Sequence, residues 1–282
     1  MKQFYLSLLL GLCTSAPVLL KAQASLTPSG YTQNFNTLAT SGTTNADLPE
    51  GWQIHETGTA ANVNGFYGAG TGSGTAGDVY SFGIAGSSER ALGTLLSGTL
   101  TPIIGASFTN TTGTTITSLT ISYTGEQWRL GTSGRLEADR LDFQYSTAAT
   151  SLTSGTYVHV DELDFTAPVT NSTAGLRDGN ADANRTLITH TITGLSIPAG
   201  STFFIRWTDY NVSGADDGLA IDDFTLMAGV PAGDVQAPVV ASYLPAPSSE
   251  GVAVATKPSL TFNESIQKVE GGSGKITITS PG

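Results

Sequence analysis

The chain of 282 residues is poor in cysteine, in charge and in long apolar runs, and each scarcity excludes a class of protein. A single cysteine, Cys13, cannot build a disulfide framework within the chain. Only 12% of the residues are charged, and the 12 cations against 23 acidic residues leave no basic face for a nucleic-acid backbone or an anionic membrane. Nothing after residue 25 approaches the ~20 consecutive apolar residues of a spanning helix, so membrane insertion is not expected there.

The first 24 residues have the pattern of a secretory signal peptide. A basic start at Met1-Lys2-Gln3 precedes an uncharged apolar run, and Ala22-Gln23-Ala24 supplies the small-x-small pattern of a signal-peptidase site. We therefore predict cleavage after Ala24 and a secreted or cell-surface protein that begins at Ser25. Cys13 would leave with the leader, and Leu12 before it is not the small residue that a lipoprotein signal needs.

The remainder of the chain alternates apolar and polar residues with the period of β-strands. Leu119, Ile121 and Tyr123 share one predicted strand face, and Phe203, Ile205 and Trp207 share another. The last strand is predicted to place four side chains on its buried face: Ala220, Asp222, Phe224 and Leu226. Glycine-rich turns separate the runs, and no stretch holds a helical period for three turns. The pattern predicts an all-β fold, an antiparallel sandwich of the jelly-roll type.

Composition divides the mature chain into two domains. Residues 25–229 form the predicted jelly roll, residues 230–238 read as a linker, and residues 239–282 supply too few strands for a complete second sandwich. Within the first domain, residues 68–77 are predicted to form a flexible surface loop, or a flap that contacts a ligand.

Several motifs resemble a jelly-roll domain of secreted Bacteroidota proteins, the cleaved-adhesin type. They are Gln33-Asn34-Phe35-Asn36-Thr37-Leu38, Leu48-Pro49-Glu50-Gly51-Trp52 and Gly218-Leu219-Ala220-Ile221-Asp222-Asp223-Phe224. Gly125-Glu126-Gln127-Trp128-Arg129 and residues 139–145 resemble a subgroup found at the front of multidomain exported proteins, some of them ahead of nuclease or phosphatase modules. The resemblance implies a surface-exposed, modular and non-catalytic domain.

Residues 237–278 resemble the bacterial Ig-like domain of the SbsA type, first described in S-layer proteins. Ala237-Pro238-Val239-Val240, Leu260-Thr261-Phe262 and Gly274-Lys275-Ile276-Thr277-Ile278 carry this similarity. The later strands of that family are missing, so we predict a partial Ig-like β-sandwich.

Acidic residues gather before and within the last predicted strand. Asp216, Asp217, Asp222 and Asp223 offer the oxygen ligands that Ca²⁺ prefers, which predicts a calcium site. The alternative is a loop held by carboxylates that accept hydrogen bonds from Arg206 or from loop amides, without a metal.

A second cluster contains Glu126, Trp128 and Arg129, which we predict to bind a ligand. The flat indole ring of Trp128 would suit a sugar ring, although a core tryptophan is the simpler interpretation. Glu126 with Asp142 has the composition of an acid–base pair, but exposed ion pairs explain such residues more simply.

The sequence favours a non-catalytic binding or adhesion protein for carbohydrate or another extracellular polymer. Two alternatives stay open: an accessory region of an extracellular hydrolase of the nuclease or phosphatase type, and a structural spacer. No catalytic residues are predicted, and Ca²⁺ is the one cofactor that the pattern suggests.

Overall fold

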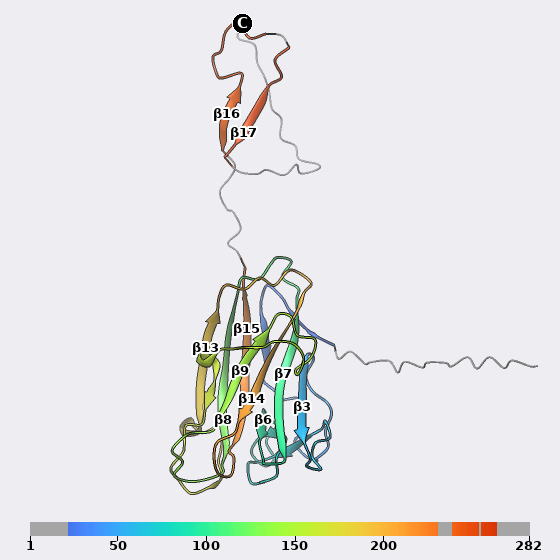
Figure 1. Ribbon diagram of the computed structural model, residues 1–282, viewed down its shortest axis with the longest axis vertical. Helices are drawn as coiled ribbons and strands as arrows, with labels where there is room; N and C mark the ends of the chain where they lie inside the picture. Colours follow the sequence, from blue (N-terminus) through green and yellow to red (C-terminus); the bar gives the residue numbers. More distant parts are fainter. Residues whose placement is uncertain (1–21, 231–238, 254, 264–282) are drawn as a thin grey trace, which may run out of the picture. The chain divides into compact units, whose positions relative to one another are not determined.

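A computed structural model describes residues 22–230, 239–253 and 255–263 of the chain. The described residues fall into two compact units, one that ends at Val230 and one that begins at Val239. The first unit is a sandwich of two large β-sheets whose long strands run along the body in Figure 1. The predicted all-β fold, an antiparallel sandwich of the jelly-roll type, is confirmed.

One sheet has seven strands in the order β1-β7-β14-β9-β10, with β3 also on β7 and β11 also on β9. Apart from β1, which pairs in parallel with β7, the neighbours are antiparallel. The strands are β1 (Ala24–Leu26), β3 (Trp52–Gly58), β7 (Leu100–Asn110), β9 (Arg140–Ser146), β10 (Val158–His159), β11 (Phe165–Thr166) and β14 (Thr202–Tyr210).

The other sheet has eight strands in the order β12-β8-β15-β6-β5-β4, with β13 also on β8 and β2 also on β15. Its strands are β2 (Tyr31–Gln33), β4 (Tyr67–Gly70), β5 (Asp78–Phe82), β6 (Ala91–Leu95), β8 (Ser118–Leu130), β12 (Gly175–Leu176), β13 (Arg185–Ile192) and β15 (Gly218–Gly229). Two short 3-10 turns, η1 (Asp161–Leu163) and η2 (Asp182–Asn184), are the only helical elements of the described ranges, and neither has the length of a membrane span.

The main core fills the space between the two sheets with alternate side chains from both. The predicted faces Leu119, Ile121, Tyr123 and Phe203, Ile205, Trp207 all point into it. Trp52 and Trp207 stack there with ring centroids 6.1 Å apart, and the Trp52 indole N–H donates to the hydroxyl of Tyr31 over 2.9 Å. Each buried aromatic ring removes a large apolar area from water, which stabilises the sandwich.

The prediction that Ala220 and Asp222 of the last strand face the main core is wrong. Leu219 and Ile221 point into the main core, whereas Ala220 packs in a separate apolar cluster. The pairing of β15 with β8 shifts register between Asp222 and Thr225, and Asp223 in between has a φ of 48°. This β-bulge inserts one residue and reverses the alternation, so that Phe224 and Leu226 point inward while Asp222 belongs to the outer face.

The second unit, as far as it is described, is an antiparallel pair of strands. It consists of β16 (Val240–Leu244) and β17 (Ser259–Phe262), and the motif Leu260-Thr261-Phe262 lies in β17. The motif Gly274-Lys275-Ile276-Thr277-Ile278 lies outside the described residues, as do the signal peptide up to Lys21 and the linker at 231–238.

Candidate functional site

The outer face of the eight-stranded sheet carries an apolar cluster of its own. Trp128 of β8 is only 1% exposed and stacks on Phe82 of β5 with ring planes 6° apart. Ala91 and Ala220 complete the cluster. A Cβ on Gly179 would overlap the Trp128 ring, so the chain around Gly179 crosses directly over the indole. This face of the sheet is therefore covered, and polar groups next to the indole are shielded from water.

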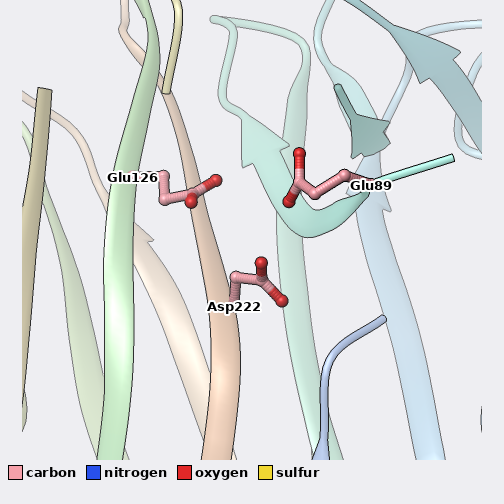
Figure 2. Close-up of side chains that lie close together, drawn as sticks. All are labelled: Glu89, Glu126 and Asp222. Atoms are coloured by element: carbon pink, nitrogen blue, oxygen red, sulfur yellow. The ribbon is translucent and has the colours of Figure 1, made fainter. Parts of the chain in front are cut away.

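Three carboxylates converge beside this cluster. Glu126 comes from β8, Asp222 from β15, and Glu89 from the turn that precedes β6; Figure 2 shows the carboxylates of all three pointing toward a common space. One oxygen from each lies within 4.8 Å of the others, and no other set of three potential metal ligands in the described residues meets this criterion. Glu126 is 1% exposed and Asp222 is 5% exposed, so two of the carboxylates are buried.

The cluster is only partly satisfied by hydrogen bonds. The indole N–H of Trp128 donates to Oε2 of Glu126 over 2.8 Å, and the amide of Asn180 donates to Oε2 of Glu89 over 2.5 Å. Oδ1 of Asp222 and Oε1 of Glu89 are buried without a hydrogen-bond partner. A buried carboxylate oxygen without a partner is costly, so this arrangement calls for a proton or a cation between the acids.

Burial is the main cause of the raised pKa values in the cluster. Burial, together with the negative charge of Glu89, raises the pKa of the Glu126 carboxyl to about 7, against the lowering effect of the Trp128 hydrogen bond. Burial raises the pKa of Asp222 to about 9, and the neighbouring Glu126 charge adds to the effect. Without a metal, protons therefore hold this cluster together at neutral pH.

The three residues fit a hard cation. They offer oxygen ligands only, and two of them have an oxygen without a partner. Within the part of the chain that the structure describes, no arginine or lysine forms an ion pair with any of the three carboxyl groups. Ca²⁺ takes six to eight such oxygens, and Mg²⁺ takes fewer with stricter geometry. A divalent cation would replace the protons that otherwise hold the carboxylates.

A shallow pocket of about 340 Å³ opens next to the same cluster, over the edge of Trp128. Ile84 and Leu176 are well-exposed apolar side chains that line it, and Arg177 and Asp178 are also among its lining residues. The residues that line it are Thr71, Ile84, Ala85, Trp128, Leu176, Arg177 and Asp178. Nε of Arg177 is buried without a hydrogen-bond partner.

Glu89 joins the two walls of this pocket. It lies near the end of the loop that contains Ile84, and its Oε2 accepts a hydrogen bond from Asn180, in the segment that follows Leu176 of β12. Glu89 therefore connects the acidic cluster with both segments that carry the pocket walls.

The acids predicted to bind calcium do not form one group. Asp216 and Asp217 lie at the end of the sandwich, where Asp217 accepts hydrogen bonds from Gln127 and from the Gly131 amide, both over 2.7 Å. Arg135 forms ion pairs there with Asp217 and Asp139. Asp222 alone belongs to the outer cluster. Asp216 and Asp217 precede β15 and Asp222 lies within it, so the extended strand holds them apart, at about 3.3 Å per residue.

Asp223 is exposed at the bulge and lines a different hollow, with Gln33 and Asn34. The guanidinium of Arg129 donates to the carbonyls of Gly72 and Ser73, which ties down the glycine-rich loop. The first part of that loop forms β4, and Thr71 after it lines the pocket.

The predicted ligand-binding residues have a different arrangement from the one expected. Trp128 and Glu126 do lie together, but the covered indole offers no open face for a sugar ring to stack on. Glu126 and Asp142 do not form an acid–base pair, because β8 and β9 belong to different sheets. Asp142 instead lies 2.5 Å from Nε of Arg140 on the same strand.

Sequence reasoning missed Glu89 and the pocket walls. Glu89 follows Gly86-Ser87-Ser88 in a turn, and no spacing links it to Glu126 or Asp222. The bulge did leave a signal, since the apolar residues of the last strand are two apart up to Ile221 and then three apart to Phe224.

No protein-family model and no curated protein matches the sequence. Among solved structures, the K1 cleaved adhesin domain of Lys-gingipain from Porphyromonas gingivalis W83 is similar, with a TM-score of 0.37, 14% identity, and 71% of this chain and 98% of that chain covered. TmCBM61 in complex with β-1,4-galactotriose has a TM-score of 0.31 and 12% identity, with 63% of this chain and 88% of that chain covered. The enzymatically active domain of tailspike protein 4 from bacteriophage CBA120 has a TM-score of 0.35 and 9% identity, with 69% of this chain but 21% of that chain covered. With TM-scores this low, function has to be inferred from the chain's own residues.

Proposed function

We propose that this chain is a secreted or cell-surface, non-catalytic protein that binds carbohydrate on an extracellular polymer. The observation that carries the proposal is the pocket beside Trp128, where exposed Ile84 and Leu176 adjoin the charged Arg177 and Asp178. Sugars present apolar C–H faces and polar hydroxyl edges, and this pocket offers matching surfaces for both. Its volume of about 340 Å³ lies at the low end of the ~300–1,000 Å³ of small-molecule sites.

The acidic cluster supports binding rather than hydrolysis. Glu126 is covered by Trp128 and its neighbours, so a substrate bond could not approach its carboxyl without displacing part of the fold. We propose that Glu89, Glu126 and Asp222 hold Ca²⁺ instead, and that the ion fixes the two walls of the pocket through Glu89.

A glycan array probed with the labelled full chain in millimolar Ca²⁺ tests the binding proposal. Leu176→Ser removes an exposed apolar wall, and we expect it to reduce the array signal at least tenfold, about 1.4 kcal/mol of binding free energy. Leu187→Ser is the matched control, because Leu187 is a 72% exposed leucine on β13 that does not line the pocket.

The two variants separate the outcomes. Loss with Leu176→Ser and retention with Leu187→Ser support the pocket. Equal signals from both variants would place binding elsewhere on the surface and overturn the site. An array without signal for the wild-type chain would overturn the carbohydrate assignment itself.

A further inference from the structure

The sandwich begins at a residue that lies before the predicted cleavage point. Strand β1 begins at Ala24, which pairs in parallel with Phe108 of β7. Ala24 is 2% exposed, although it is the residue that the small-x-small pattern would remove.

The backbone at Gly51 packs so closely on Ala24 that a larger residue would not fit there. Gly51 has a φ of 83°, and a Cβ added to it would lie 2.6 Å from the backbone nitrogen of Ala24 and 2.7 Å from its Cβ. The backbone of the Gly51 turn, whose carbonyl accepts from the Ser107 amide over 2.9 Å, thus packs directly on Ala24. Cleavage after Ala24 would leave this contact empty.

Gln23 also has a place in the fold. Its side-chain oxygen accepts a hydrogen bond from the hydroxyl of Thr109 on β7 over 2.6 Å and from that of Thr202 on β14 over 2.8 Å. One side chain therefore bridges two neighbouring strands of the seven-stranded sheet. Ala22, the residue before it, is exposed.

From these contacts we infer that the leader is removed by hydrolysis of the Ala22–Gln23 peptide bond, so that the mature chain begins at Gln23. Water adds across this bond, which leaves a carboxylate on Ala22 and an ammonium group on Gln23. Ala22 is a small residue immediately before the cut, and the aliphatic Leu20 stands three residues before it, where the small-x-small pattern has a small residue. The inference rests on the predicted leader and is independent of the proposed carbohydrate binding.

Export of the full chain from Met1 by a bacterial host, followed by intact-mass and N-terminal sequence determination, tests the cut. A first residue of Gln23, with its amine free or cyclised onto its own side chain with loss of ammonia, is expected. Any other first residue, Ser25 above all, overturns the inference.

A variant and a stability measurement make the test independent of one host's peptidase. Ala24→Leu places a bulky residue immediately before the Ala24–Ser25 bond, which would block cleavage there but not at Ala22–Gln23. Processing of freshly labelled precursor should therefore be unchanged, and a block of processing would contradict the inference. Chains produced without a leader and starting at Gln23 or at Ser25 should differ in melting temperature by about 5 °C or more, because the shorter chain loses two hydrogen bonds and a buried residue. Equal melting temperatures would show that Gln23 and Ala24 contribute nothing to the fold and would overturn the structural basis.

Discussion

Replacing Glu126 with glutamine should change stability in opposite directions with and without calcium. Without a metal, burial holds the pKa of this carboxyl at about 7 instead of its ordinary 4.5, so the folded protein favours the protonated form. A group whose pKa is raised on folding contributes its stability at low pH and loses it as the pH rises through the folded value. The metal-free wild type should therefore lose stability between about pH 4 and pH 8.

The size of this effect follows from the two pKa values. A change from 4.5 to about 7 corresponds to about 3 kcal/mol of unfolding free energy at 1.36 kcal/mol for each tenfold change in acidity. For a domain of this size that is about 6 to 12 °C in melting temperature. Glu126→Gln cannot ionise, and its amide oxygen can still accept from Trp128, so in EDTA near pH 8 the variant should melt above the wild type.

Calcium should reverse the order. At one thousand times its dissociation constant, an ion that binds only the folded chain adds about 4.1 kcal/mol, or about 8 to 16 °C, to the wild type, which exceeds the loss of about 3 kcal/mol. The gain should shrink toward about pH 5, where protons occupy the same oxygens. Glu126→Gln should gain little.

Thermal unfolding followed by circular dichroism, in EDTA and in millimolar Ca²⁺ at several pH values, measures both effects. Glu162→Gln is the control for a lost negative charge, since Glu162 is exposed in η1, outside the cluster. If Glu126→Gln lowers the melting temperature equally in EDTA and in Ca²⁺, neither the raised pKa nor the metal site holds.

Two further predictions concern the packing and charge of the same unit. Gly179→Ala should destabilise the fold by about 1–3 kcal/mol in urea unfolding, because its methyl group would overlap the ring of Trp128. In the control Gly98→Ala the added methyl group meets nothing within 4 Å and should change stability little. Equal effects of the two substitutions would refute the close packing of the chain at Gly179. Burial and a hydrogen bond with Glu56 raise the pKa of Asp78 to about 7. The Asp78→Asn variant should therefore melt above the wild type near pH 8 but not near pH 5. A difference in melting temperature that does not depend on pH would contradict a proton shared by Asp78 and Glu56.

The fold was largely predictable because it follows from local alternation. Leu119, Ile121 and Tyr123 point to one side in any straight strand, and the structure buries all three. The prediction failed at Asp222, where a register shift changes the face without changing the residue types. Asp223 has the left-handed backbone conformation, which aspartate tolerates better than most residues, but aspartate is also common elsewhere, so its residue type alone did not mark the bulge.

The candidate site was only partly predictable because sheet pairing assembles it from distant segments. Ala220 pairs with Glu126 on one side of β15 and with Gly93 of β6 on the other, which brings the turn at Glu89 next to Asp222. Nothing in a single sequence states which strands are neighbours. Trp128 was expected either as a surface for a sugar ring or as a core residue. The loop that crosses its indole at Gly179 buries it, which the sequence alone did not show.

Because Glu89 belongs to the acidic cluster and is hydrogen-bonded to Asn180, close to the pocket walls, binding of the two proposed ligands would be coupled in one thermodynamic cycle. If Ca²⁺ raises the affinity for a sugar by some factor, the sugar must raise the affinity for Ca²⁺ by that same factor. A protein of this kind would bind its polymer only where calcium is plentiful and release it where calcium is withdrawn. The calcium concentration of the surroundings would then decide when the protein holds its polymer.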